Sequence, residues 1–202
     1  MAMHRWLLCL SLALVPAANT TAQEPVLGGP CEGCELVFAG LPATLDAIAR
    51  IAPPEEPGER LVIEGTVRDR AGHAVPGIIV YAYQTDATGV YPRGETRHGR
   101  LRGWARSDAQ GRYRFETIRP AAYPTRTVPQ HVHMHVIEPG RGTYYIDDIV
   151  FSDDPLLDDE ARKSMRQGRG GHGEVQPTRD GNGIWQVRRD IELGKGVPGY
   201  PD

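Results

Sequence analysis

Apolar and polar residues alternate along most of the chain after residue 61, with the period of two that is typical of β-strands. Turn residues such as the run Asp69-Arg70-Ala71-Gly72 separate the alternating stretches. Short strands at regular spacing predict an all-β fold, namely a β-sandwich of mostly antiparallel strands with short peripheral helices and long loops. The predicted strands are residues 61–68, 77–83, 104–107, 112–116, 131–137, 144–151 and 185–193.

Other local patterns predict a hairpin, two helices and a long loop. The strands at 104–107 and 112–116 flank the turn Asp108-Ala109-Gln110-Gly111 and are predicted to pair as a hairpin. Apolar residues at Leu41, Leu45, Ile48 and Ile51 fit one face of a short helix, which prolines at 53, 54 and 57 would end. Residues 155–165 also fit a helix, with a proline in the first turn and acidic residues early. Loops as long as 85–103 are more often functional than idle.

Composition places the chain among ordinary globular proteins. Its 202 residues suffice for one domain with a real core, and 40% are hydrophobic and 24% charged. The net charge of −3 gives no reason to expect nucleic acid or an anionic membrane as a partner. We predict three parts: a signal peptide at 1–22, an N-terminal segment at 23–60 with a cysteine pair and the short helix, and the sandwich domain at 61–202.

The first 22 residues have the composition of an export signal. His4 and Arg5 precede an apolar run at 6–15, and residues 20–22 fit a cleavage site. The run is too short to span a bilayer, so we expect no membrane span after cleavage and a periplasmic or secreted protein. Cleavage would remove Cys9 and leave Cys31 and Cys34, which in an oxidising compartment would form a disulfide. A redox-active role for this CxxC pair stays open.

The strand at 131–137 carries three histidines on one face. Successive side chains of a strand point to opposite faces, so His131, His133 and His135 lie on one side and the residues between them pack on the other. Two imidazoles at positions i and i+2 can bind one metal ion without distorting the backbone. A metal site is therefore the favoured interpretation of this strand, and a solvated polar face is the alternative.

Two tyrosines stand in unusual settings elsewhere in the chain. Tyr91 lies in the long loop, and Tyr123 lies in the run Pro120-Ala121-Ala122-Tyr123-Pro124. A free phenol has a pKa near 10, and a strongly charged cation lowers the pKa of a group that it binds. A hard ferric ion suits phenolate oxygen, and tyrosine is a known iron ligand.

In these motifs the sequence resembles the intradiol ring-cleavage dioxygenases, the family of protocatechuate and catechol dioxygenases. The resemblance covers residues 61–155, about half of the chain. Gly65-Thr66-Val67 with Gly72 and Pro76 matches the opening strands of the family, and residues 108–115 followed by 120–124 match the run to the second tyrosine. Tyr91 and Tyr123 stand where the family has its two tyrosine ligands, and His131-Val132-His133 matches its His-x-His motif.

The resemblance implies a cofactor and an activity. A non-haem Fe(III) ion would be held by Tyr91, Tyr123, His131 and His133 together with solvent, and His135 would lie beside the ligands or in solvent. The enzyme would be an oxidoreductase that cleaves a catechol-type aromatic ring with O₂ to a cis,cis-muconate type diacid. Tyr123 would leave the metal when substrate binds and would act as a base.

Three positions depart from the family pattern. The arginine that the family's aromatic-acid enzymes have three residues before the first histidine is Val128 here, and Arg126 is the candidate to take its catalytic role. The usual tryptophan eight residues before the first tyrosine ligand is Tyr83, and a glutamine after the histidine pair is replaced by Asp148. We expect Tyr83 and Asp148 to line the substrate pocket and Asp148 and Arg126 to tune substrate choice.

Two further functions remain open. The strand and turn pattern is also similar to that of carboxypeptidase-regulatory-like extracellular domains, which would make the chain a non-catalytic β-sandwich binding module. Alternatively, His131, His133 and His135 together would carry copper or zinc. The enzymatic interpretation predicts a small aromatic diol and O₂ as partners, and the sequence leaves homo-oligomer formation open.

Overall fold

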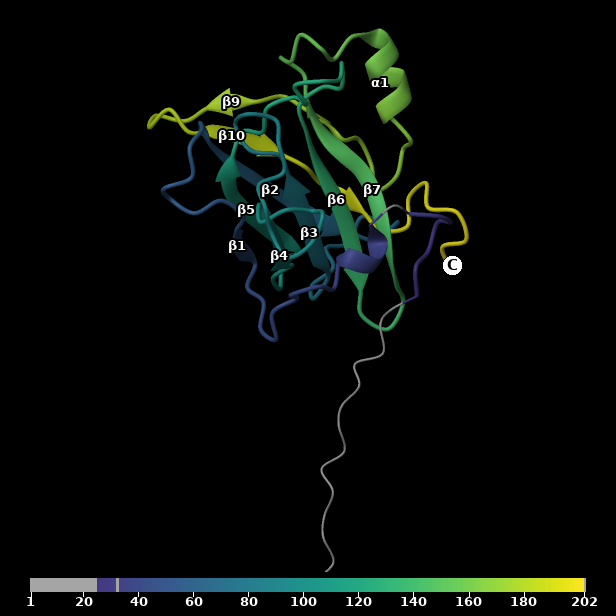
Figure 1. Ribbon diagram of the computed structural model, residues 1–202. Coiled ribbons are helices and arrows are strands. Elements are labelled where there is room, and N and C mark those ends of the chain that lie inside the picture. The colour runs from purple at the N-terminus through teal and green to yellow at the C-terminus, as the bar shows by residue number, and fades with distance from the viewer. Residues whose placement is uncertain (1–24, 32, 202) are drawn as a thin grey trace, which may run out of the picture.

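The computed structural model describes residues 25–31 and 33–201 and has two β-sheets packed face to face (Figure 1). Hydrophobic residues of both sheets, among them Ile63, Phe115, Val80 and Met134, form one buried cluster between them. The predicted all-β sandwich is confirmed. The predicted signal peptide at 1–22 lies outside the described residues, and the described residues contain no helix that is long and apolar enough to cross a membrane.

The sheets are mixed rather than purely antiparallel. The pairs β1–β5, β10–β2, β11–β2 and β7–β8 are parallel, and the other paired strands are antiparallel. In the first sheet the order is β1 (Ile48–Arg50), β5 (Arg112–Ile118), β2 (Arg60–Arg68), β10 (Trp185–Arg188) and β9 (Thr178–Arg179), with β11 (Ile191–Glu192) also on β2. In the second sheet it is β4 (Arg102–Arg106), β3 (Ile79–Gln84), β6 (His131–Glu138), β7 (Gly142–Phe151) and β8 (Glu174–Val175).

The hairpin predicted at 104–116 is wrong, although its turn is correct. Gly111 donates its backbone N–H to the carbonyl oxygen of Asp108, and the Asp108 carboxylate accepts from the backbone of Gln110 and Arg112. The flanking strands then part, because β4 pairs with β3 and β5 pairs with β2. The turn therefore carries the chain from one sheet to the other.

The helix predicted at 41–51 is also wrong. Residues 48–50 form the edge strand β1, and the only helical piece of the described N-terminal segment is the short 3-10 helix η1 (Cys34–Leu36). The backbone of this stretch bonds to distant strands: Arg114 donates to the carbonyl of Ala47, and Ile51 donates to the carbonyl of Glu116. Ile51 is buried while Ile48 is exposed, so tertiary pairing outweighs the helical spacing.

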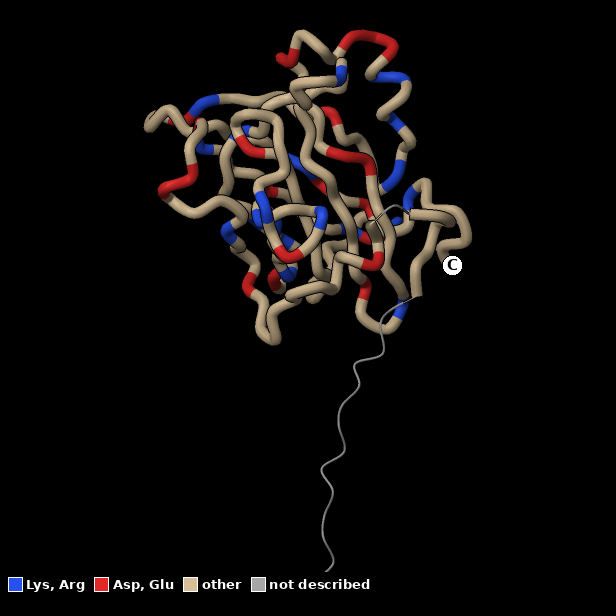
Figure 2. Tube along the Cα trace, in the orientation of Figure 1, with Lys and Arg blue, Asp and Glu red and all other residues tan. Residues whose placement is uncertain are grey.

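The helix predicted at 155–165 begins later than the sequence indicates. Helix α1 (Asp159–Met165) starts after Asp158, whose carboxylate accepts a hydrogen bond from the backbone of Ala161, as an N-cap does. Pro155 lies before the helix, in a turn in which Leu157 donates its backbone N–H to the carbonyl of Asp154. Figure 2 shows acidic residues at the start of α1 and basic residues after them, an order that suits the helix dipole.

The strand predicted at 185–193 is broken in two at Arg189. The Arg189 side chain is 1% exposed and donates to the carbonyls of Gly170, Asp190 and Asp147, so it turns into the protein instead of continuing the alternation. A Cβ atom at Gly65 would lie 1.9 Å from the carbonyl oxygen of Arg189, so only glycine allows β2 to pass this close.

Strand β6 is central in its sheet, between β3 and β7. Val132, Met134 and Val136 point into the core cluster, which leaves the three histidines on the opposite face, as alternation predicts. The pairing of β6 with β7 shifts register between Val132 and Met134, so Asp147 and Asp148 both face His133. Such a bulge re-aims side chains next to a site.

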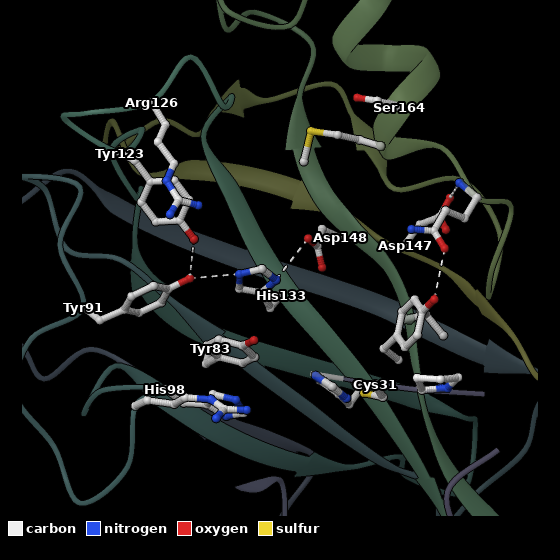
Figure 3. Close-up of a pocket in the computed structure, with 17 residues that line it drawn as sticks. Cys31, Tyr83, Tyr91, His98, Tyr123, Arg126, His133, Asp147, Asp148 and Ser164 are labelled. Carbon is white, nitrogen blue, oxygen red and sulfur yellow. Dashed lines mark hydrogen bonds and ion pairs between the residues drawn. The ribbon is translucent and has the colours of Figure 1, made fainter. Parts of the chain in front are cut away.

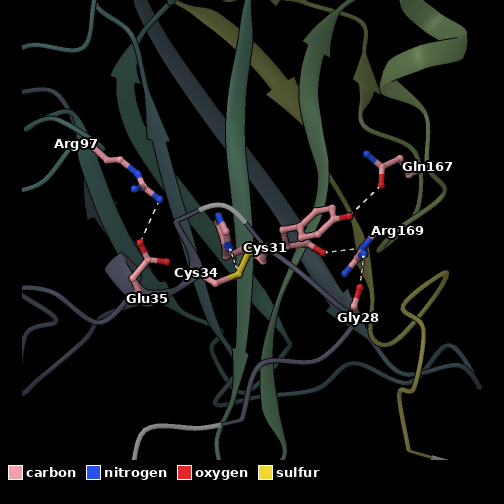
Figure 4. The surroundings of a disulfide bond; sticks show 9 residues. Gly28, Cys31, Cys34, Glu35, Arg97, Gln167 and Arg169 are labelled. Carbon is pink, nitrogen blue, oxygen red and sulfur yellow. Dashed lines mark hydrogen bonds and ion pairs between the residues drawn. A yellow bond between two sulfur atoms is a disulfide. The ribbon is translucent and has the colours of Figure 1, made fainter.

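The N-terminal segment lies across β6 and β7 and contains a disulfide (Figure 4). Cys31 and Cys34 are joined with their Cα atoms 5.5 Å apart, and the Sγ atom of Cys34 lies 3.7 Å from Nδ1 of His135. Glu35 forms an ion pair of 3.1 Å with Arg97 from the long loop. Leu27 donates its backbone N–H to the carbonyl of Thr143, and the Trp104 ring donates to the carbonyl of Val37, so these bonds hold the segment against the second sheet while the disulfide closes a short loop within it.

We expect the mature protein to contain no free thiols. Cys31 and Cys34 are already paired, and cleavage of the predicted signal peptide would remove Cys9. Thiol titration of the denatured, unreduced protein should detect less than one thiol per chain, and two thiols would contradict the prediction.

Candidate active site

Four side chains meet at one point on the face of the second sheet that carries the histidines, and Figure 3 labels three of them, Tyr91, Tyr123 and His133. The Tyr91 and Tyr123 hydroxyl oxygens lie 2.7 Å apart. Nε2 of His133 lies 2.9 Å from the Tyr91 hydroxyl, and Nε2 of His131 lies 3.2 Å from the Tyr123 hydroxyl. Two phenol oxygens and two imidazole nitrogens therefore point at one another from three separate parts of the chain.

The two tyrosines lie in loops that are joined to each other by a backbone hydrogen bond. The Asp86 carboxylate accepts from the backbone of Thr88 and Val90 and so shapes the turn before Tyr91. The backbone of Ala121 donates to the carbonyl of Asp86, which joins this turn to the loop that carries Tyr123. Gly89 has a φ of +80°, and a Cβ atom there would lie 2.0 Å from the carbonyl oxygen of Ala122, so glycine is required at this crossing.

Hydrogen bonds determine which nitrogen each histidine offers to the centre. Nδ1 of His131 lies 2.7 Å from the carbonyl oxygen of Pro129, an acceptor only, so Nδ1 carries the proton. Nδ1 of His133 lies 3.0 Å from the Asp148 carboxylate, about a quarter of which is exposed. Both rings therefore direct Nε2 at the tyrosines, in the arrangement that metal-binding histidines adopt.

Burial makes the charged forms of His131, Tyr91 and Tyr123 less favourable. Burial lowers the pKa of His131, so its ring is neutral at neutral pH, as a metal ligand must be. Burial raises the pKa of Tyr91, and the hydrogen bond with Tyr123 raises it further. Burial likewise raises the pKa of Tyr123. Neither phenol would ionise here alone, so phenolates at this point require a cation that compensates their charge.

Tyr91, Tyr123 and His133 border a pocket of about 570 Å³. Figure 3 shows Tyr91, Tyr123 and Arg126 on one side of it, His133 and Asp148 in the middle, and Asp147 on the other side. Tyr83 lines the pocket, and its ring stacks with those of His98 and His133, whose centres lie 3.8 Å and 4.4 Å from its own. Asp148 lines it too, and its bond to His133 also orients that ring.

Arg126 and Asp147 differ in how far they are available to a ligand. Arg126 is exposed at the rim, and its guanidinium lies 5.9 Å from the centre of the Tyr123 ring. The Asp147 carboxylate accepts hydrogen bonds from the backbone of Gln167, Gly168 and Arg169. Asp147 therefore stabilises the loop after α1, whereas the Arg126 side chain is exposed at the rim of the pocket.

His135 does not join the other two histidines. It is 3% exposed and lies against Cys34 and the ring of Tyr81, so of the two expected positions, beside the ligands or in solvent, the solvated one is wrong. The described residues group His131 and His133 with Asp148, and group His135 with the cysteines. A copper or zinc site made of all three histidines therefore has no support in this geometry.

Several residues at the pocket are not indicated by the sequence patterns. His98 is buried, and its Nδ1 is 2.8 Å from the Tyr81 hydroxyl. Tyr145 and Gln167 face the pocket from β7 and from the loop after α1. The length of the loop at 85–103 was the one signal for His98, and no local signal marks the other two.

The family model and the similar proteins that match this chain all describe dioxygenases. The sequence model of the family described as Dioxygenase matches residues 38–176, more than half of the chain. The protocatechuate 3,4-dioxygenase beta chain of Burkholderia cepacia is 34% identical over 112 residues, which are 50% of this chain and 48% of that protein. The hydroxyquinol 1,2-dioxygenase of Rhodococcus opacus is 44% identical over 69 residues, 33% of this chain and 23% of that one. The chain thus spans at most about half the length of these relatives.

Solved structures share the fold. The 3-chlorocatechol 1,2-dioxygenase of Rhodococcus opacus 1CP aligns with a TM-score of 0.61 at 20% identity, covering 78% of this chain and 68% of that one. The dioxygenase domain of a dioxygenase and carbohydrate-binding protein fusion from Streptomyces sp. SirexAA-E aligns with a TM-score of 0.58 at 21% identity. That alignment covers 77% of this chain and 94% of the domain.

Proposed function

Because the chain belongs to the intradiol ring-cleaving dioxygenase family, we propose that it is a non-haem Fe(III) enzyme that cleaves a catechol-type ring with O₂ to a cis,cis-muconate type diacid. The observation that carries the proposal is the convergence of the Tyr91 and Tyr123 hydroxyls with Nε2 of His131 and of His133. A binding module without catalysis has no need of this convergence.

The donor set fits a ferric ion. Two phenolates and two neutral imidazoles combine hard oxygen donors with nitrogen donors and bring two negative charges to a trivalent cation. Such an ion would act as a Lewis acid that draws electron density from a bound catecholate. The raised pKa of both phenols supports the same conclusion, since only a strong positive charge would make them phenolates in this buried position.

The chain's own residues would orient the diol and move its protons. Tyr123 lies beside the exposed Arg126 on the open side of the centre, so its oxygen is placed to take a proton from an incoming catechol hydroxyl. Tyr91 and His133 lie deeper, between Tyr83 and the Tyr123 hydroxyl. Asp148 holds the His133 ring in position.

We also propose that the protein works outside the cytoplasm, in the periplasm or after secretion. The predicted signal peptide at 1–22 and the disulfide between Cys31 and Cys34 support this location. Fractionation of cells that express the full chain, with amino-terminal sequencing of the product, would test it.

The proposed activity is tested by O₂ uptake with catechol, protocatechuate and hydroxyquinol. Iron-loaded protein should consume one O₂ per diol and yield the ring-opened diacid. The absence of O₂ uptake with every diol, from protein that holds stoichiometric iron, would refute the activity.

We expect neutral catechols to be better substrates than carboxylated ones. The Asp148 carboxylate lines the pocket beside His133, and a substrate carboxylate close to it would be repelled. Catechol should exceed protocatechuate in kcat/KM by about tenfold, which corresponds to one charge repulsion of about 1.4 kcal/mol. Asp148→Asn should narrow this gap, and a wild-type preference for protocatechuate would contradict the expectation.

A further inference from the structure

The pocket is much larger than a single-ring catechol requires. Catechol has eight non-hydrogen atoms, and if each occupied as much space as a water molecule they would fill at most about 240 Å³. The pocket measures about 570 Å³, so more than half of it stays empty once a catechol lies at the four candidate ligands. This remaining space lies toward β7, the end of α1 and the disulfide (Figure 3).

Tyr145 forms a rigid aromatic surface in that space. The Arg169 guanidinium lies 3.5 Å from the centre of its ring, which places a cation on one face, and the Tyr145 hydroxyl donates to the Gln167 side chain at 3.1 Å. Nε of Arg169 also donates to the Tyr145 carbonyl. The ring is therefore held in place, half-buried, and borders the pocket.

The position of Tyr145 along the sheet suits a substituent on the catechol ring. Tyr145 is paired with His135 on β6, and His133 lies two residues further along that strand, a rise of about 7 Å. A ring attached directly to a catechol held beside His133 would extend over this distance toward Tyr145. No movement of the backbone is needed to bring the two together.

The rest of the lining combines apolar and polar residues. Pro30 and Cys31 border the space from the N-terminal segment, and Met165 borders it from α1. The charged groups nearby already have partners: Asp147 accepts three backbone N–H groups, and Arg97 is paired with Glu35. Because the nearby charges are satisfied within the protein, an aromatic surface beside Pro30, Cys31 and Met165 favours an aryl group over a charged chain.

We propose that this half of the pocket is a subsite for a second aromatic ring, so that the substrate is a catechol bearing an aryl substituent. The proposal rests on the proposed function, because it assumes that the diol lies at the four candidate ligands. Tyr145 is then a specificity-determining residue that stacks with the second ring, and Pro30 and Cys31 border the same space.

The test compares 4-phenylcatechol with catechol as substrates of iron-loaded full-length protein. The kcat/KM of wild type for 4-phenylcatechol should exceed its kcat/KM for catechol about tenfold or more. Tyr145→Ala should reduce this ratio of the two kcat/KM values about tenfold, mainly through KM for 4-phenylcatechol. Tyr145→Phe keeps the ring and should keep the ratio. Leu156→Ala, a change of an exposed residue outside the pocket lining, is the matched control and should also keep it.

Two results would overturn the subsite: a wild-type ratio below one, or a ratio that is the same in Tyr145→Ala as in wild type. Failure of the proposed function gives a different result, namely no O₂ uptake with either compound. In that case equilibrium binding decides, since Tyr145→Ala must still weaken binding of 4-phenylcatechol about tenfold relative to catechol. The same binding measurement decides if Tyr145→Ala proves too unstable for kinetics, with Tyr145→Leu used in its place.

Discussion

Replacing His133 with alanine is expected to remove the iron from the protein and with it essentially all ring cleavage. Nε2 of His133 faces the Tyr91 hydroxyl at 2.9 Å, and no other residue of β6 can supply a nitrogen there, because His135 is buried against Cys34. His131→Ala should have the same effect. Iron content measured by elemental analysis should fall well below one per chain.

Asp148→Asn is the control that distinguishes loss of the ligand His133 from loss of the carboxylate that orients the His133 ring. The amide keeps the size of the Asp148 side chain and a weaker acceptor for Nδ1 of His133. Removing the partner of a metal-bound histidine typically weakens metal binding about 10- to 100-fold, so this variant should bind iron when iron is in excess. A His133→Ala protein with full iron and wild-type turnover would show that His133 is not a ligand.

Tyr123→Phe should behave differently, keeping much of its iron and losing turnover. The change removes one oxygen but preserves the ring, and Tyr91, His131 and His133 remain to bind the metal. The lost oxygen is the proposed proton acceptor for the catechol, and removing such a group typically slows a reaction about 10²- to 10⁴-fold. The visible absorption should weaken and shift, since one phenolate remains.

Single-turnover rates and iron content of the same preparation test this division between the two tyrosines. Tyr91→Phe is the matched control, because it removes the phenol that is proposed to stay on the metal, and it should lose more iron than Tyr123→Phe. If Tyr123→Phe bound and converted catechol like wild type, Tyr123 would only pack against its neighbours and the proposed site would be wrong.

Local sequence patterns correctly predicted the features that follow from the alternation and spacing of strands. The face shared by the histidines of β6 follows from the period of two, and the sandwich follows from the spacing of the strands. The resemblance to a family supplied Tyr91 and Tyr123, because no periodicity brings two loops together. Their meeting depends on bonds such as that between Ala121 and Asp86, which link residues far apart in the chain.

The errors share one physical cause, which is long-range pairing that local patterns do not report. Asp108 and Gly111 specify a turn but do not specify that it crosses between sheets. Apolar residues at 41–51 have helical spacing, but Ile48–Arg50 pairs with β5 as a strand and Ile51 donates its backbone N–H to the carbonyl of Glu116. His135 shares a face with the other histidines, yet the disulfide-linked segment covers it. The bulge that turns Asp148 toward His133 likewise appears only once β6 and β7 are paired.

Iron content and the visible spectrum of protein purified without a tag test the central claim most directly. If Tyr91, Tyr123, His131 and His133 bind Fe(III), the protein will hold about one iron per chain and will be coloured, because phenolate bound to Fe(III) absorbs visible light by ligand-to-metal charge transfer. The colour should fade in Tyr91→Phe and Tyr123→Phe. Stoichiometric iron in a colourless protein would contradict the tyrosine ligands. Copper or zinc in place of iron, or no metal in a folded protein, would contradict the proposed enzyme.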